Sequence, residues 1–284
     1  MAGKESETKS FNETTVSSYS KNCANVYDDP QNKNFVYGEI TIDFLRSIRF
    51  GPADRSILDI GCGTGFGFEV LEDEFSRLGM QGIGVEPAQG MLDLAIEKFH
   101  GKEKFAFLKG SFECIPVEDC SVDRIISTLA LHWASSIEVA IEEMKRVLKP
   151  GGGIDLLMIA KDDGAKFKRP VVEAMKKHLT FSQIMHAATL ALRIEPVELK
   201  KAVEKSFGPG YSVVVKNPRR IILGSFEEHM KWWTARSSAI IANVKNKTQF
   251  FRDLKSEMAA IATGQGIPFD LSCLFLRVKG HSNG

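Results

Sequence analysis

Short apolar runs alternate with amphipathic segments between residues 51 and 160, and this alternation limits the fold more than any other feature of the chain. The runs have the length of strands, and the segments between them repeat apolar side chains at the spacing of a helix. Strands that are apolar on both faces and joined by helices are typical of a parallel sheet with helices on each side. The predicted strands are Ser56–Ile60, Gln81–Glu86, Lys104–Lys109, Val122–Thr128 and Ile154–Ala160. The sequence therefore predicts an α/β fold with a doubly wound, mostly parallel sheet of seven strands.

The remaining segments are expected to complete this core. Residues 161–210 contain two helical stretches with no strand between them, and we expect a helical cap there, inserted after the fifth strand. Residues 211–284 carry one or two strands at Tyr211–Leu223, interrupted by Asn217-Pro218, and a further strand at Leu271–Val278. A long helical region separates these strands, which should complete the sheet. Residues 1–50 are predicted to be a leader, in which a disordered tail precedes helices that lie over the functional site.

Composition excludes several classes of function. The chain of 284 residues has 37 basic and 36 acidic side chains, so its net charge of +1 gives no support for binding nucleic acid or an anionic membrane. No segment approaches the roughly 18 apolar residues of a membrane span. The five cysteines are odd in number and lack the close pairing of zinc sites. We therefore expect no metal, and a reducing, cytoplasmic location.

A glycine-rich turn follows the first predicted strand. It contains Asp59, Gly61, Gly63 and Gly65. Ligands of open parallel sheets bind beyond the carboxyl ends of the strands, where glycine lets the backbone approach a ligand closely. A dinucleotide site needs a third glycine at a fixed spacing, and in this chain that position falls on Phe66 or Phe68. A carboxylate such as Asp59 would also repel a pyrophosphate, whereas it would attract an ammonium group.

A second carboxylate, Glu86, ends the second predicted strand. An acidic side chain at this place can accept hydrogen bonds from both hydroxyls of a ribose. S-adenosylmethionine combines a ribose with an ammonium and a sulfonium and carries no phosphate. Asp59 and Glu86 together therefore favour this cofactor over a dinucleotide.

Five stretches, in this order, resemble motifs of the class I S-adenosylmethionine-dependent methyltransferases, which have a Rossmann-like core. The stretches are 58–65, 86–92, 110–116, 123–133 and 146–152. One difference is Ser111, which stands where the family commonly has an aspartate that accepts a hydrogen bond from the adenine amino group. The resemblance covers roughly residues 55–160, and it implies S-adenosylmethionine as the cofactor and methyl transfer as the activity.

The resemblance also implies a set of cofactor-binding residues. The methionyl and ribose parts are expected along the backbone of Gly61, Gly63 and Gly65, with Asp59 at the ammonium and Glu86 at the ribose. The adenine is expected beside Pro87, Met91, Ser111 and Phe112. The backbone of Thr128 and Leu129 is expected under the sulfonium arm, and Tyr19 of the leader is expected to close over the cofactor.

The acceptor of the methyl group is less constrained than the cofactor. We expect a small-molecule acceptor with a reactive oxygen, nitrogen or carbon. The stretch Leu129–Trp133 and the leader resemble the branch that methylates carboxylates, which includes malonyl-carrier-protein, trans-aconitate and juvenile-hormone-acid methyltransferases, and the general layout is similar to histamine-type N-methyltransferases. His132 is the candidate catalytic residue, because an imidazole can deprotonate or orient an acceptor; alternatively, it packs against Trp133.

Two other features leave alternatives open. Trp232 and Trp233 are adjacent on a predicted helix, so we expect one in the core and the other available to hold a flat acceptor. The chain could also be a non-catalytic binding protein that keeps the cofactor fold, or an NAD-dependent oxidoreductase, which the glycine spacing disfavours.

Overall fold

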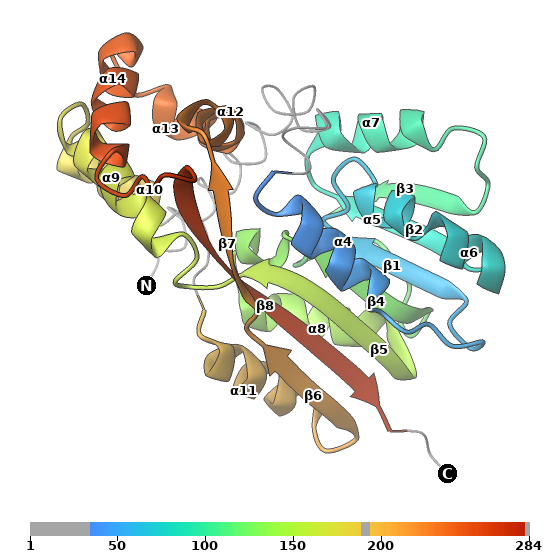
Figure 1. Cartoon of the computed structure of the whole chain (residues 1–284). Coiled ribbons are helices and arrows are strands. Elements are labelled where there is room, and N and C mark those ends of the chain that lie inside the picture. The colour runs from blue at the N-terminus through green and yellow to red at the C-terminus, as the bar shows by residue number, and fades with distance from the viewer. Residues whose placement is uncertain (1–34, 189–193, 282–284) are drawn as a thin grey trace.

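The computed structural model describes residues 35–188 and 194–281, and within them eight strands form one mixed sheet (Figure 1). The strand order is β3-β2-β1-β4-β5-β8-β6, with β7 paired to β8 as well. The first five strands are parallel, and β8 runs antiparallel to its neighbours β5, β6 and β7. The strands are β1 Ser56–Ile60, β2 Gln81–Glu86, β3 Phe105–Lys109, β4 Val122–Thr128, β5 Leu148–Ile159, β6 Tyr211–Lys216, β7 Arg219–Gly224 and β8 Ile267–Gly280. The predicted α/β fold is confirmed.

The prediction of seven strands is wrong by one, because the pattern at Tyr211–Leu223 forms two strands. Pro218 has no N–H for a strand ladder, and pairing is interrupted between Lys216 and Arg219. Asn217 bridges the gap with its side-chain amide, which donates to the Cys273 carbonyl at 2.7 Å. As a result β6 pairs with the second half of β8, and β7 pairs with the first half.

Helices cover both faces of the sheet and enclose two apolar cores. On one face the covering helices are α4 Gly38–Arg46, α5 Phe66–Val70 and α6 Glu72–Leu78, and on the other they are α8 Ile137–Val147 and α11 Pro196–Phe207. Helix α7, Gln89–Lys98, packs against β2 and β3. Helices α5 and α6 are separated by Leu71, whose backbone (φ −100°, ψ 7°) leaves the helical region. None of the helices in the described part of the chain is long and apolar enough to cross a membrane.

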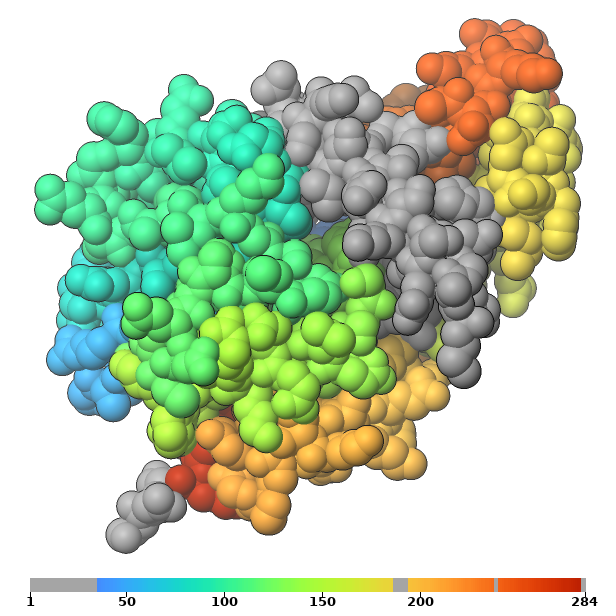
Figure 2. All heavy atoms as spheres, turned by 180° about the vertical axis from the view of Figure 1, so that it is seen from behind, coloured from blue at the N-terminus to red at the C-terminus, as the bar shows by residue number. Residues whose placement is uncertain are grey.

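A group of helices, here named the helical lobe, lies at one end of the molecule (Figure 1). It consists of α9 Ala165–Lys176, α10 Phe181–Ala188, α12 Phe226–Arg236, α13 Ser238–Ile241 and α14 Lys247–Met258. Helices α9 and α14 pack along one another and appear together at one corner of Figure 2, whereas α11 lies beside α8. Residues 161–210 therefore contribute both to the lobe and to the layer over the sheet. The chain enters the lobe from the carboxyl end of β5, next to the edge where β1, β2 and β4 also end.

Candidate functional site

The glycine-rich turn connects β1 to α5 and lies against the ends of two neighbouring strands. Its three glycines all have positive φ, 70° at Gly61, 56° at Gly63 and 83° at Gly65. The Gly61 N–H donates to the Val85 carbonyl of β2 at 2.7 Å. A Cβ on Gly61 would lie 2.3 Å from the Cβ of Ala130, so only glycine lets the turn contact the segment that follows β4. At Gly63 a Cβ would meet no atom of the described residues within 4 Å.

Asp59 is a buried carboxylate in the middle of the sheet, just before this turn. Its side chain is 2% exposed, and Oδ1 has no hydrogen-bond partner among the described residues. A Cβ on Gly67 would lie 2.6 Å from Oδ2, so the first turn of α5 leaves space for the carboxylate because it lacks that atom. The pKa of Asp59 is raised to about 8, mainly by burial and to a smaller extent by repulsion from Glu86. Buried polar groups almost always have a partner, so this carboxylate is a place where a cationic ligand group would fit.

Glu86 ends β2 and connects the turn to the segment after its own strand. Its Oε2 accepts a hydrogen bond from the Gly63 N–H at 3.0 Å, and its Oε1 accepts one from the Ala88 N–H at 2.8 Å. Burial raises the pKa of Glu86 to about 7, although the two hydrogen bonds act to lower it. Each carboxylate oxygen can accept more than one hydrogen bond, so both oxygens can still receive hydroxyls.

The end of β4 forms another wall of the site. Ser127 is fully buried, and its hydroxyl donates to the Ile60 carbonyl at 2.6 Å, which joins the ends of β4 and β1. Thr128 and Leu129 are half-buried. Leu129 has φ 56°, a backbone conformation that is unfavourable for any residue other than glycine. Its N–H donates to the Leu157 carbonyl at 2.7 Å. A strained backbone of this kind is typical of functional sites.

The loop from residue 110 to 121, here named the β3–β4 loop, brings an aromatic ring to the glycine turn. Phe112 is 6% exposed, and its Cε2 lies 3.7 Å from the position of a Cβ on Gly61. Ser111 pairs with Cys114 through both backbone groups, and its hydroxyl accepts a hydrogen bond from the Glu113 N–H at 3.3 Å. The hydroxyl is therefore already used in the turn of the loop itself.

The other predicted site residues are in different situations. Met91 is buried in the first turns of α7, and Pro87 is half-buried just before that helix. His132 is buried in the short 3₁₀ helix Leu131–Trp133, where its ring centroid is 5.0 Å from that of Trp133. Tyr19 lies outside the described residues. Within the two described ranges, no group of three or more His, Cys, Asp or Glu side chains could hold a metal ion.

The adjacent tryptophans both belong to α12 of the helical lobe, and their rings have different neighbours. Trp232 is 5% exposed and its ring lies 5.2 Å from that of Phe269, which confirms that one of the two is in the core. Trp233 is half-buried and stacks on Phe250 with a centroid distance of 6.3 Å. Its use in holding an acceptor stays a prediction.

Sequence reasoning missed three residues that shape the site. Ser127 could have been found as the hydroxyl within an apolar strand, and Gly67 as a glycine inside the first turn of a helix. Ala130 has no such local signal, because its contact with Gly61 depends on the pairing of β1 with β4.

Comparison with known proteins identifies what the central part of the chain is similar to. Residues 58–154 match a protein family described as "Methyltransferase domain". Over 96 residues the chain is 38% identical to the malonyl-[acyl-carrier protein] O-methyltransferase of Yersinia pestis, a match that covers 34% of this chain and 33% of that protein. The chain spans less than half of the length of the curated relatives considered, with shares from 19% to 46%.

Solved structures resemble a larger part of the chain. The YcgJ protein of Bacillus subtilis aligns with a TM-score of 0.55 at 18% identity, over 86% of this chain and 98% of that one. Phosphoethanolamine N-methyltransferase 2 of Haemonchus contortus, solved in complex with S-adenosyl-L-methionine, aligns with a TM-score of 0.56 at 16% identity, over 90% of this chain and 59% of that one. At such low identities these similarities concern the fold alone.

Proposed function

This chain belongs, through residues 58–154, to the class I S-adenosylmethionine-dependent methyltransferases, and we propose that it transfers a methyl group from S-adenosylmethionine to a small-molecule acceptor. The observation that carries the proposal is the Asp59 carboxylate, which is buried, has no hydrogen-bond partner for Oδ1 among the described residues and has a second buried carboxylate, Glu86, as its charged neighbour. Two buried acids at a glycine turn provide a site for a cationic nucleoside, whereas they would repel a pyrophosphate.

The residues at the carboxyl edge of the sheet fit this cofactor. Asp59 would bind the ammonium, directly or through water, and Glu86 would accept the ribose hydroxyls. The backbone of Gly61, Gly63 and Gly65 would run along the methionyl and ribose parts. Pro87, Met91, Ser111 and Phe112 would surround the adenine, with Thr128 and Leu129 under the sulfonium arm and Tyr19 closing over the site.

The protein contributes mainly alignment to the reaction. The bound cofactor supplies a methyl group that is already activated by the sulfonium. The side chains around it therefore need to hold the acceptor in line and to exclude water, and alignment alone can supply roughly 7–11 kcal/mol of the barrier. His132 is proposed to orient the acceptor or to take its proton when that acceptor is a phenol, an amine or a carbon acid. A carboxylate acceptor needs no base.

The choice of acceptor is proposed to depend on parts of the chain outside the matched residues. The Yersinia pestis relative is named for a malonyl group on a carrier protein, but its match covers only 34% of this chain. The helical lobe follows β5 at the site edge and lies outside the family match. We therefore propose that the lobe and the leader select a small acceptor, with a carboxylic acid as the first class to test.

The proposal is tested with donor that carries an isotopic label on its methyl group. The purified chain is incubated with sets of free carboxylic acids, amines and phenols, and in a separate arm with acids bound to a carrier protein. We expect label in one class of free small molecules, with little transfer by Asp59→Asn and unchanged transfer by Asp43→Asn, whose aspartate forms an exposed ion pair with Arg220.

Other results would contradict specific parts of the proposal. Label only in carrier-bound acids would overturn the small-molecule acceptor and leave methyl transfer intact. Binding of the donor without transfer to any acceptor would indicate a binding protein. Thermal stabilisation by NAD rather than by S-adenosylmethionine would indicate an oxidoreductase.

A further inference from the structure

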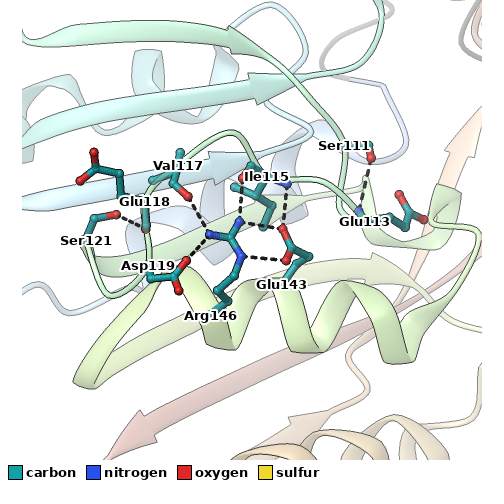
Figure 3. Close-up of polar contacts among 9 residues, drawn as sticks. All are labelled: Ser111, Glu113, Ile115, Val117, Glu118, Asp119, Ser121, Glu143 and Arg146. Atoms are coloured by element: carbon teal, nitrogen blue, oxygen red, sulfur yellow. Dashed lines mark hydrogen bonds and ion pairs between the residues drawn. The ribbon is translucent and has the colours of Figure 1, made fainter.

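Arg146, on the last turn of α8, uses its whole guanidinium group to bind the β3–β4 loop and a neighbour on its own helix (Figure 3). An arginine side chain has five N–H donors in a fixed planar arrangement. Nε donates to Glu143 Oε1 at 2.8 Å. Nη2 donates to Glu143 Oε2 and to the Ile115 carbonyl, both at 2.8 Å. Nη1 donates to the Val117 carbonyl at 2.9 Å and to Asp119 Oδ1 at 2.7 Å. Every donor therefore has an acceptor.

Glu143 adds a contact that the arginine cannot make. Its Oε2, which accepts from Arg146, also accepts a hydrogen bond from the Ile115 N–H at 3.0 Å. The pair therefore holds both backbone groups of Ile115, the N–H through the glutamate and the carbonyl through the arginine (Figure 3). The Ile115 side chain is buried in the core on the same face as α8.

The fixed point at Ile115 is three residues from the ring that faces the cofactor site. Phe112 belongs to the same buried core and lies beside the glycine turn at Gly61. A second connection starts at Glu113, whose Oε1 accepts hydrogen bonds from the N–H and the hydroxyl of Ser135, beyond the 3₁₀ helix that carries His132. The path of the loop from residue 111 to 115 is thus set by residues outside the proposed cofactor site.

We infer that Arg146 and Glu143 are positioning residues, which hold the β3–β4 loop in the shape that receives the adenine and touch no cofactor atom themselves. The inference rests on the proposed function, because it assigns the loop to the base of S-adenosylmethionine. Without the pair, the Ile115 and Val117 carbonyls would turn to water, and Phe112 would sample positions away from Gly61. Binding of any adenine-containing ligand would then include the cost of ordering the loop.

Arginine is required in this position for a geometric reason. A lysine ammonium has three donors at one point and cannot reach two carbonyls and a bidentate carboxylate together. The Asp119 contact matters less than the others, because that carboxylate is 73% exposed. Arg146→Lys therefore keeps the positive charge but removes the planar set of donors that binds the two carbonyls and the Glu143 carboxylate.

The test compares binding, exchange and turnover in Arg146→Lys and in the milder variant Glu143→Gln. Calorimetry with S-adenosylhomocysteine and with 5′-methylthioadenosine should show Kd increased about tenfold for both ligands in Arg146→Lys, since both carry the adenine. Hydrogen exchange of the segment 111–121 should become faster in both variants. The kcat at saturating donor should change by less than about twofold.

Arg77→Lys is a matched control. Arg77 forms the same kind of pair with Glu74, at 2.5 Å and three residues apart on α6, and makes no contact with the β3–β4 loop among the described contacts. Its substitution should leave Kd and the exchange of segment 111–121 unchanged. A purely structural role of Arg146 would lower the unfolding temperature and leave Kd, measured well below that temperature, unaltered.

Four results would overturn all or part of the inference. Unchanged exchange in segment 111–121 would show that the pair does not hold the loop. Faster exchange with unchanged Kd would show that the loop shape does not control adenine binding. A decrease in kcat with unchanged Kd would show the same. If the wild-type chain bound neither ligand, the proposed function and the adenine assignment would both fail, and exchange alone would still decide whether the pair orders the loop.

Discussion

Two buried aspartates lie in one row across the sheet and have opposite surroundings. Asp59 of β1 and Asp155 of β5 are both in register with Ile126 of β4, so they point to the same face. Asp155 is 4% exposed and sits between two arginines, with Oδ2 3.3 Å from Arg124 Nη1 and Oδ1 3.0 Å from Arg277 Nε. Asp59 is equally buried, but the charged neighbour that shifts its pKa is another acid, Glu86.

The two aspartates differ in whether the folded chain compensates their charge. Burial raises the pKa of Asp155 as well, but Arg124 and Arg277 act against that rise and compensate the charge within the folded chain. No described residue compensates Asp59, so the folded chain alone does not favour its ionised form. A cationic ligand would supply the missing charge, and on this basis we propose that Asp59 belongs to the binding site and that Asp155 does not.

The largest effect is expected from breaking the compensated pair. Asp155→Asn leaves Arg124, which is 13% exposed, beside an uncharged amide, and we expect it to lower the free energy of unfolding by about 3 kcal/mol. Chemical denaturation of the free chain measures this loss. The Kd for S-adenosylhomocysteine should stay within about twofold of the wild type; a large change in Kd with unaltered stability would contradict the structural role.

The corresponding change at Asp59 should have the opposite profile. Asp59→Asn removes the carboxylate that would bind the ammonium, and a hydrogen bond to a charged group is worth about 2 kcal/mol, so Kd for S-adenosylhomocysteine should rise about 30-fold. The free energy of unfolding of the free chain at pH 8 should be equal or higher, because an uncompensated buried charge is gone. A destabilised variant with unaltered Kd would contradict this account. 5′-Methylthioadenosine, which lacks the ammonium, is the matched ligand and should lose little affinity.

The stability of the free chain should fall as the pH rises from about 4 to about 8. In the unfolded chain Asp59 and Glu86 have ordinary pKa values of 3.8 and 4.5, whereas burial raises them in the folded chain to about 8 and about 7. The folded chain therefore holds protons that the unfolded chain releases, and stability decreases with pH across this window. Denaturation at pH 5, 6.5 and 8 measures the slope, and Asp59→Asn should make it shallower. A slope that is the same in the variant would show that Asp59 does not titrate as described.

The smallest effect is expected from the hydrogen bond between the ends of the central strands. Ser127→Ala removes the donor to the Ile60 carbonyl and should cost about 1 kcal/mol of stability. Because this bond positions the start of the glycine turn, Kd for the donor should rise by a few-fold, which thermal denaturation and calorimetry together can measure. Ser76→Ala is the control, because it removes an exposed hydroxyl that donates to the Glu72 carbonyl on α6. This variant should change neither the stability nor the Kd.

Local sequence patterns were sufficient for the parallel half of the sheet. The predicted bounds of β1, β2 and β4 agree with the structure, because buried strands between glycine turns leave a clear apolar run. The antiparallel half was harder. The interruption at Asn217-Pro218 is visible in the sequence, but whether Tyr211–Leu223 forms one strand or two depends on pairing with β8, far along the chain. The same limit applies to the site. Asp59 and Glu86 can be found from their places at strand ends. That no described residue bonds to Asp59 Oδ1, and that Arg146 contacts residues 115–119, depends only on tertiary packing.

The most direct test of the central claim is a count of the protons released when S-adenosylmethionine binds. Calorimetric titrations at pH 7, in buffers with different enthalpies of ionisation, give this number for the wild-type chain and for Asp59→Asn. Because a cation would pull the raised pKa values of Asp59 and Glu86 back down, the wild type should release about one proton and the variant clearly less. Binding without proton release, or equal release by both proteins, would contradict the claim that the buried acids receive the cationic cofactor.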